Sequence, residues 1–461
     1  MAWREECAVF GAWDDFEAGQ MTYLGLYAQQ HRGQESAGIV SLDNGYHVDH
    51  KGLGLVGDIF DEAALERLKG RAAIGHVRYS TTGRNLLANA QPLTAQLHSG
   101  PIAIAHNGNI VNSAVLKEEL VRQGAIFQGS NDTEVLLHLI ARQGQVDIKT
   151  GIVNALKKMQ GAFSMVVLTN NAMFVARDPY GFRPLVLGRR KVEGREQAST
   201  VVASETCAFD LIGAKYEREI APGELYWIDE EGEGSVQFAE STRTAHCVFE
   251  HVYFSRPDSK VFDRSVYETR KQMGKVLSDE SGVEADIVVP VPDSGVTSAI
   301  GYSEASGIPF ELGIIRNHYI GRTFIQPSQS IRSFGVKIKL NPQREILAGK
   351  RVIVIDDSLV RGTTSQKIIN LVRQAGAKEV HFRVASPPTT GGCYYGVDTP
   401  KRRSLIAAVK TQEEIREFIG ADTLAYLSVE GMMKAVNAPY ESYCAACFDG
   451  KYPTELYGSD L

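Results

Sequence analysis

Cysteine is scarce in this sequence, which has six in 461 residues. Domains built on disulfides are far richer in cysteine, so a disulfide scaffold is excluded and the thiols are expected to serve chemistry or metal binding in a reducing cytosol. No apolar stretch approaches the roughly 20 residues that a membrane span needs. The first six residues are polar and lack the apolar core of a secretory signal. We therefore expect a cytoplasmic protein.

Positive charge is not in excess either. The chain has 49 lysines and arginines against 55 acidic residues, a net charge of −6. This balance argues against a nucleic-acid partner, and the missing apolar span argues against a membrane partner. The sequence also has no internal repeat, low-complexity tract or coiled-coil heptad pattern. Its composition, 43% hydrophobic and 23% charged, is that of a globular protein, and its length suggests about two to four domains.

The chain divides into two halves near residue 240. The first half has short β-rich segments broken by glycine, with strands expected over 72–78, 102–106, 163–168 and 172–177 and helices over 132–140 and 152–159. In the second half, strands expected over 287–292, 351–357 and 378–384 alternate with helices. That alternation predicts a mostly parallel sheet covered by helices. We expect a leader over 1–6, a first domain over 7–240 and a second over 241–461.

Cys7 directly follows the short leader Met-Ala-Trp-Arg-Glu-Glu. Removal of this leader would place a thiol and a free α-amine on one residue. An α-amine titrates near pH ~8, so it can accept the thiol proton at neutral pH. Nucleophile and base would then share Cys7, a variant of the serine–histidine arrangement. The alternative is a buried cysteine on a first strand, and these residues alone do not decide between the two.

A strand of the second half is expected to end in two carboxylates. Four apolar residues, 352–355, precede Asp356 and Asp357, and the turn 361–364 leads into a helix expected over 366–374. Beyond the carboxyl end of a parallel strand, turn amides and a helix N-terminus suit a phosphate monoester. The carboxylates suit sugar hydroxyls or Mg²⁺. We therefore predict a site for a phosphorylated ribose with a metal ion, against the alternative of two solvated acids after a strand.

Two further segments fit this prediction. Asp293 and Ser294 follow another expected strand, although Pro-Asp-Ser-Gly is also a common turn. The segment 319–337 is long, basic and punctuated by glycine. Long loops are usually functional or disordered, and basic residues suit a lid that closes over a polyanion and excludes water. A solvated surface loop is the alternative.

The segment around Asp356 resembles the 5-phosphoribosyl pyrophosphate (PRPP) motif of the type I phosphoribosyltransferases. In the first half, Glu-Glu-Cys-Ala-Val-Phe-Gly around Cys7 and the segments that begin at His31, Gly75, His106 and Ser130 resemble the class II glutamine amidotransferases. Together these motifs span nearly the whole chain. The resemblance implies an N-terminal-nucleophile, four-layer αββα glutaminase domain followed by a type I phosphoribosyltransferase domain with a mostly parallel sheet, an α/β and α+β protein.

The resemblance also implies roles for single residues. In the first half these are Cys7 as nucleophile, Asn107 and Gly108 as oxyanion hole, and Arg78, Thr81 and Asp132 as glutamine contacts. A guanidinium suits the α-carboxylate of glutamine, and an aspartate suits its α-ammonium. In the second half the PRPP contacts are Asp293, Ser294, Asp356, Asp357, Arg361, Gly362, Thr363 and Thr364, with Ser294, Asp356 and Asp357 also near Mg²⁺. Surface ion pairs and a hairpin turn at Asn107–Gly108 are the alternatives.

Four cysteines of the second half form a separate set: Cys247, Cys393, Cys444 and Cys447. By count, four thiolates suit zinc and an iron–sulfur cluster equally. A Cys-x-x-Cys pair alone also fits redox chemistry. The resemblance implies a [4Fe–4S] cluster with a structural role. Cys207 matches no motif and is expected in the core.

The two resemblances imply an enzyme that hydrolyses glutamine at Cys7 and passes ammonia to PRPP. Pyrophosphate would be displaced to give 5-phosphoribosylamine, the first step of de novo purine biosynthesis. A homotetramer inhibited by purine nucleotides is also implied. Three alternatives stay open: a phosphoribosyltransferase that takes a base and has a vestigial first half, a non-catalytic PRPP or purine sensor, and another class II amidotransferase such as an amino-sugar synthase. The presence of Asp356 and Asp357 together with Cys7 in the sequence disfavours the sensor and the other amidotransferase.

Overall fold

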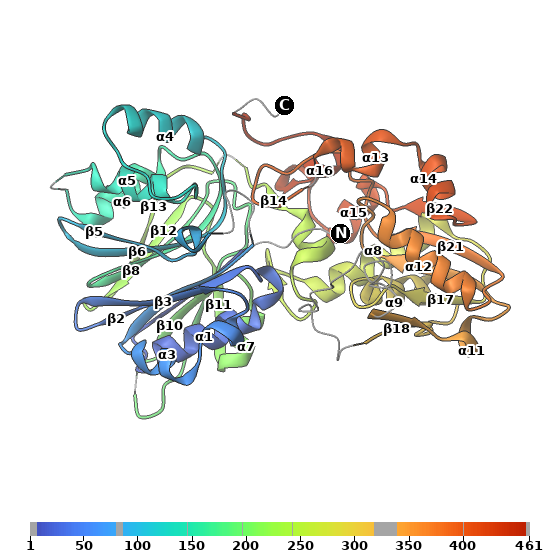
Figure 1. The fold of residues 1–461 in the computed structure, drawn as a ribbon, viewed down its shortest axis with the longest axis horizontal. Coiled ribbons are helices and arrows are strands. Elements are labelled where there is room, and N and C mark those ends of the chain that lie inside the picture. Colours follow the sequence, from blue (N-terminus) through green and yellow to red (C-terminus); the bar gives the residue numbers. More distant parts are fainter. Residues whose placement is uncertain are drawn as a thin grey trace.

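A computed structural model describes residues 7–79, 86–144, 146–195, 197–241, 243–317, 339–399 and 401–457. The chain forms two lobes side by side, the first coloured blue to green and the second yellow to red in Figure 1. The predicted boundary at residue 240 lies between strand β13, which ends at Gln237, and strand β14, which begins at His246. Within the described ranges, none of the helices combines the length and apolar character needed to cross a membrane.

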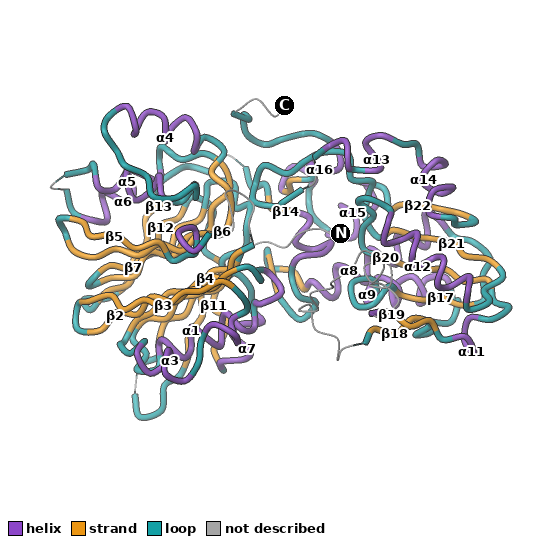
Figure 2. Tube along the Cα trace, in the orientation of Figure 1, coloured by secondary structure: helices purple, strands orange, loops and turns teal. Residues whose placement is uncertain are grey.

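Two stacked sheets form the centre of the first lobe (Figures 1 and 2). One has the order β11-β9-β10-β1-β4-β2-β3, with β1 (Ala8–Trp13), β2 (Ser36–Asp43), β3 (Tyr46–Leu53), β4 (Ala72–Arg78), β9 (Val186–Arg190), β10 (Ser199–Ala203) and β11 (Ala214–Glu219). The other has the order β13-β12-β8-β7-β6-β5, with β5 (Leu93–Leu97), β6 (Gly100–Ile110), β7 (Gly161–Thr169), β8 (Ala172–Arg177), β12 (Glu224–Asp229) and β13 (Glu233–Gln237). Neighbouring strands are antiparallel throughout both sheets.

Helices cover both outer faces of this sandwich. On one side lie α1 (Ala18–Ala28), α3 (Glu62–Arg67) and α7 (Cys207–Ile212), and on the other α4 (Ser113–Arg122), α5 (Glu134–Ala141) and α6 (Ile148–Leu156) (Figure 1). Strands β1, β4 and β7 are buried along their whole length because each sheet is covered on both faces. The core between the sheets includes Val9 and Ile74 from one and Val166 and Val175 from the other. The predicted αββα architecture is confirmed.

The second lobe contains a parallel sheet in the order β17-β20-β21-β22. Its strands are β17 (Ile287–Pro290), β20 (Arg351–Asp356), β21 (Glu379–Val384) and β22 (Thr423–Tyr426). The larger helices around it are α8 (Val266–Ser281), α9 (Val296–Ser306), α12 (Thr363–Gln374), α14 (Gln412–Ile419) and α15 (Val429–Val436). The parallel sheet predicted from alternating strands and helices is therefore confirmed. Since β17 and β20 are parallel neighbours, their carboxyl ends lie at the same edge.

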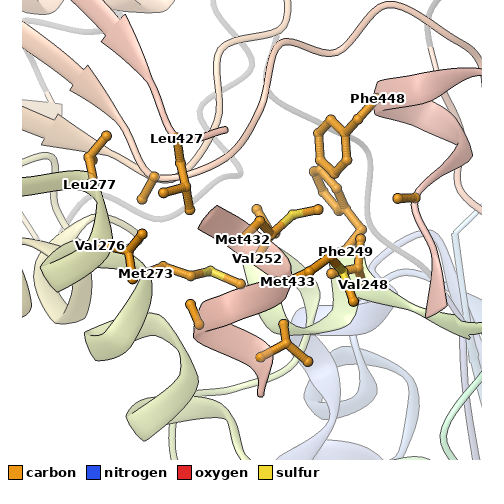
Figure 3. Close-up of a cluster of buried hydrophobic side chains, with 14 of the residues drawn as sticks. Val248, Phe249, Val252, Met273, Val276, Leu277, Leu427, Met432, Met433 and Phe448 are labelled. Carbon is orange, nitrogen blue, oxygen red and sulfur yellow. The ribbon is translucent and has the colours of Figure 1, made fainter. Parts of the chain in front are cut away.

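Short elements complete the second lobe where it meets the first. Strand β14 (His246–Cys247) pairs with β23 (Tyr443–Cys444). A π-helical turn η3 (Glu250–Phe254) follows β14 in the chain, and helix α16 (Ala446–Asp449) follows β23. Their apolar side chains pack against α8 and α15 in one buried cluster, drawn in Figure 3. Phe249, Val252, Met273, Met432 and Phe448 belong to it. This packing fixes η3 between the lobes.

Element boundaries differ from prediction where capping decides them. The helix expected over 152–159 begins at Ile148, because the carboxylate of Asp147 accepts a hydrogen bond from the Thr150 amide at 3.0 Å and caps it. It ends at Leu156. The helix expected over 366–374 begins at Thr363, directly after Gly362 with φ +72°. Strands β4 and β8 match their predicted bounds.

Candidate active sites

Cys7 lies at the start of β1, beside the end of β4. The antiparallel register pairs Ala8 with Val77, so Cys7 lies across from Arg78. The Cys7 thiol is 8% exposed and lies 3.5 Å from the carbonyl oxygen of Tyr79, to which it can donate. The thiol is therefore buried at the end of an inner strand of the sheet, beside one of the predicted glutamine contacts.

The predicted oxyanion donors lie on β6, which packs under β1. The side-chain amide of Asn107 lies 3.4 Å from the hydroxyl of Ser204, and that hydroxyl also accepts the amide hydrogen of Val9 at 3.0 Å. Ser204 therefore links Asn107 to β1 at Val9, two residues after Cys7. Gly108 has φ +146°, and a Cβ there would lie 2.1 Å from the Ala162 carbonyl oxygen, so only glycine fits.

The other predicted glutamine contacts surround this end of β1. Arg78 is 3% exposed at the end of β4. Asp132 accepts the amide hydrogen of Ile110, two residues beyond Gly108, at 2.9 Å, and lies 3.9 Å from His106. Thr81 lies outside the described residues. The structure therefore brings a cation and an anion to the same end of the sandwich as Cys7.

Every residue predicted to contact PRPP lines one pocket with an empty volume of about 950 Å³ at the carboxyl ends of β17 and β20. The eight are Asp293, Ser294, Asp356, Asp357, Arg361, Gly362, Thr363 and Thr364. Tyr253 and Arg316, which sequence reasoning missed, also line it, and Arg316 forms an ion pair with Asp293. No local motif marks either of them.

The two carboxylates of this pocket are held by short-range hydrogen bonds. Asp356 accepts the amide hydrogen of Asp357 at 3.0 Å and lies 3.5 Å from the Ser294 hydroxyl, while the Ser358 hydroxyl donates to Asp357 at 2.6 Å. Burial and the adjacent Asp357 carboxylate raise the pKa of Asp356 well above its usual value. Two buried acids side by side favour binding of a cation, and their oxygens with that of Ser294 form a hard donor set that suits Mg²⁺.

Cys247, Cys393, Cys444 and Cys447 line one cavity with an empty volume of about 390 Å³. Its remaining walls are largely apolar, with Phe182, Phe249, Tyr395, Val397 and Ala446. In the described part of the chain, no three or more His, Cys, Asp or Glu residues are close enough together to hold a single metal ion. The four thiols therefore line a shared cavity but do not converge on the position of one metal ion. Cys207 is buried in the core, as predicted.

Sequence reasoning missed a set of buried charges beside Cys7. The Arg32 Nε donates to the Cys7 carbonyl oxygen at 3.1 Å, and its guanidinium is paired with Glu205 and Glu250. His31 also contacts Glu205, at 2.8 Å. The segment that begins at His31 was a visible motif, but the two glutamates lie 173 and 218 residues from Arg32.

The basic segment predicted as a lid, 319–337, lies outside the described residues, as does the leader. The described chain resumes at residue 339, and Leu340–Pro342 forms strand β19 paired with β18 (Ile314–Arg316). These two strands flank the segment, and their residues Arg316 and Leu340 both line the pocket that contains Asp356 and Asp357.

Comparisons with known proteins cover both lobes. Residues 76–210 match the model of a glutamine amidotransferase domain, and residues 265–406 match that of a phosphoribosyl transferase domain. The chain is 50% identical over 458 residues to amidophosphoribosyltransferase of Bacillus subtilis, covering 98% of this chain and 95% of that protein. It is 52% identical over 453 residues to chloroplastic amidophosphoribosyltransferase 1 of Arabidopsis thaliana, covering 98% of this chain and 79% of the relative. A solved structure of the Bacillus subtilis glutamine PRPP amidotransferase complexed with ADP and GMP superposes with a TM-score of 0.92 at 50% identity, over 98% of each chain.

Proposed function

The chain belongs to the amidophosphoribosyltransferase family, and we propose that the residues described above divide its reaction between the two lobes. The enzyme is a glutamine amidotransferase joined to a phosphoribosyltransferase, and it catalyses the first step of purine biosynthesis. The observation that carries the assignment of residues is that all eight predicted PRPP contacts line one pocket. The position of Cys7 across from Arg78 gives the corresponding support in the first lobe.

In the first lobe, we assign the nucleophile to Cys7. After removal of the leader, its α-amine takes the thiol proton and the thiolate attacks the carboxamide carbon of glutamine. Asn107 and the Gly108 amide stabilise the negative oxygen of the tetrahedral intermediate. The C–N bond then breaks, ammonia leaves with the proton, and water hydrolyses the thioester to glutamate. Arg78 and Asp132 orient the amino-acid end of the substrate.

In the second lobe, ammonia attacks C1 of PRPP and the bond from C1 to the pyrophosphate oxygen breaks. The amides and hydroxyls of Gly362, Thr363 and Thr364 at the start of α12 bind the 5-phosphate. Asp356 and Asp357 accept hydrogen bonds from the ribose hydroxyls and, with Ser294, offer ligands to Mg²⁺. When bound, Mg²⁺ supplies charge neutralisation at the leaving pyrophosphate. The product is 5-phosphoribosylamine.

Cys7→Ala tests the division of labour. The variant should lose glutamine hydrolysis and glutamine-dependent pyrophosphate release, because the attacking thiol is gone. Pyrophosphate release with ammonium chloride as nitrogen donor should persist, because that reaction needs the second pocket alone. Equal loss of both activities in a folded variant would contradict the two-site assignment. Intact-mass measurement of the wild type reports whether the leader is removed.

We also propose that Cys247, Cys393, Cys444 and Cys447 hold a [4Fe–4S] cluster with a structural role. Four cysteines that line one largely apolar cavity suit a cluster, whereas one zinc ion requires thiolates that converge on a single point. When bound, the cluster supplies a cross-link between β14, the loop that contains Cys393, and the β23–α16 segment. Iron and acid-labile sulfide analysis of anaerobically purified protein tests this, with Cys393→Ser as the variant expected to lose both.

Regulation and assembly complete the proposal. The related Bacillus subtilis structure is a complex with ADP and GMP, which supports inhibition of this enzyme by purine nucleotides. We further propose a cytoplasmic homotetramer, in keeping with the reducing compartment that free thiols require. Calorimetry with GMP and light scattering after size exclusion test the two points separately.

A further inference from the structure

Four charged side chains form a buried network where the two lobes meet. Arg32, Arg183, Glu205 and Glu250 are each at most 1% exposed. Their two positive and two negative charges balance. A buried ion is tolerated only with partners of opposite charge and good geometry, so the members of this network determine one another's positions. Strand β14, just before Glu250, is labelled between the lobes in Figure 1.

Arg32 connects the network to the nucleophile. Its Nε donates to the carbonyl oxygen of Cys7 at 3.1 Å. The peptide group between Cys7 and Ala8 is held from two sides: Ala8 pairs with Val77 of β4, and the Cys7 carbonyl oxygen accepts from Arg32. The bond from Arg32 therefore adds a constraint on that peptide plane at its oxygen, and with it on the direction of the Cys7 thiol and amine.

Glu250 orients Arg32 through a two-pronged contact. Its carboxylate oxygens accept from Arg32 Nη1 at 2.8 Å and from Nη2 at 2.7 Å, while Glu205 offers a single oxygen at 2.6 Å. A bidentate pair fixes the plane of a guanidinium more firmly than a single contact. Glu250 is itself held by the Ser255 hydroxyl at 2.7 Å and by Arg183 Nη1 at 3.2 Å.

We propose that Glu250, a residue of the second lobe, is a positioning residue for glutamine hydrolysis in the first lobe. Its carboxylate orients Arg32, and Arg32 orients Cys7 for attack on the carboxamide carbon. This inference rests on the proposed role of Cys7 as nucleophile. Glutamine is bound by other residues, so Glu250 affects the attack and leaves substrate affinity unchanged.

The test is Glu250→Gln in the full-length enzyme. A misdirected nucleophile costs about 10- to 100-fold in rate, so kcat for glutamine hydrolysis should fall by that factor. KM for glutamine and the ammonia-dependent release of pyrophosphate should stay within about twofold of wild type. Labelling of Cys7 by a diazoketone analogue of glutamine should slow in parallel with kcat, while alkylation by iodoacetamide keeps its wild-type rate.

Glu224→Gln is the matched control. Glu224 is also a buried carboxylate in a bidentate pair, with Arg218 at 2.8 Å to each oxygen, but it lies on β12 away from Cys7. Its kcat should match wild type. A Glu250→Gln enzyme with unchanged kcat, or with glutamine and ammonia activities lost in parallel, would overturn the inference.

Ser255→Ala keeps the inference testable if Glu250→Gln fails to fold. It removes one hydrogen bond to Glu250 and leaves every charge of the network in place. A smaller fall of kcat at constant KM is therefore expected, and an unchanged kcat would overturn the inference. A wild-type enzyme that makes no glutamate, or a Cys7→Ala enzyme that does, would instead contradict the proposed function. The two failures are therefore distinguishable.

Discussion

Asn107 is the side chain on which stabilisation of the tetrahedral intermediate should depend. Its side-chain amide donates to the Ser204 hydroxyl, which also accepts the backbone amide hydrogen of Val9. Ser204 therefore holds the Asn107 amide near Cys7. Asn107→Ala should lower kcat for glutamine by about 10²- to 10³-fold, because one oxyanion donor is lost. Ammonia-dependent activity should not change. Asn154→Ala, on the outer helix α6, serves as control and should leave both rates intact, as measured by coupled glutamate and pyrophosphate assays.

His76 should give the fold a defined pH dependence. Burial lowers the pKa of His76 from 6.5 to about 3, and its hydrogen bond to the His106 carbonyl offsets this only in part. The unfolded chain protonates His76 below pH 6.5, whereas the folded chain protonates it only below about pH 3. The contribution of His76 to the free energy of unfolding is therefore full above pH 6.5 and is lost as the pH falls through this window. The loss is about 1.4 kcal/mol for each pH unit.

The variant His76→Gln isolates this contribution because glutamine does not titrate. Between pH 6.5 and 5.0 its free energy of unfolding in urea should fall less steeply than that of wild type, by the slope of one proton. Parallel slopes for the two proteins would show that His76 titrates normally in the folded state.

Residues within short motifs could be singled out from the sequence, whereas the residues that hold them in place through long-range contacts could not. Arg78, Asp132 and Asp356 each lie in a short segment whose chemistry matches one part of a substrate. Glu250 has no such context, because its partner Arg32 lies 218 residues away and only the fold brings them together. Long-range ion pairs of this kind leave no local pattern in a single sequence.

The α12 helix and the turn before it bring together the groups that we assign to the 5-phosphate of PRPP. Gly362 at its start has φ +72°, and an added Cβ would lie 2.9 Å from Ile406 Cδ1. Gly362→Ala should therefore shift the turn and raise KM for PRPP about tenfold, which corresponds to about 1.4 kcal/mol of binding. Glutamine- and ammonia-dependent synthesis should suffer alike. Initial-rate measurements over a PRPP series check this.

Gly420→Ala is the control for backbone strain. Gly420 ends α14 with φ +78°, and an added Cβ would meet no atom within 4 Å. The variant should lose about 1–2 kcal/mol of stability, the cost of a left-handed residue, without a change in KM for PRPP. If both variants raised KM equally, the turn at Gly362 would not be the phosphate cradle.

Apolar patterning located some buried strands closely, as β4, β8 and β20 show, because buried strands are rich in apolar and β-branched residues. It named only four strands of the first half, and most of the strands of that lobe were not predicted. Helix starts were predicted less well, since they depend on capping by single residues such as Asp147. The three-residue strand β19 was not predicted, because its pairing with β18 is set by tertiary contacts.

The whole molecule joins two catalytic lobes through one packed junction rather than a linker. Strand β14, η3 and α16 bring Cys247, Cys447, Glu250 and the pocket residue Tyr253 into that junction. Sequence texture predicted two halves and a boundary near residue 240. It could not predict that residues beyond the boundary complete the first lobe, because that depends on how the halves pack.

The Arg32–Glu250 pair has a consequence for recombining such enzymes. A glutaminase unit transplanted from this chain onto an unrelated synthase would carry a buried guanidinium whose main counter-ion stayed behind in the donor. Any chimera must therefore bring a carboxylate to the same spot from its new neighbour. Compatibility between exchanged units would be decided by this one electrostatic match before any question of substrate arises.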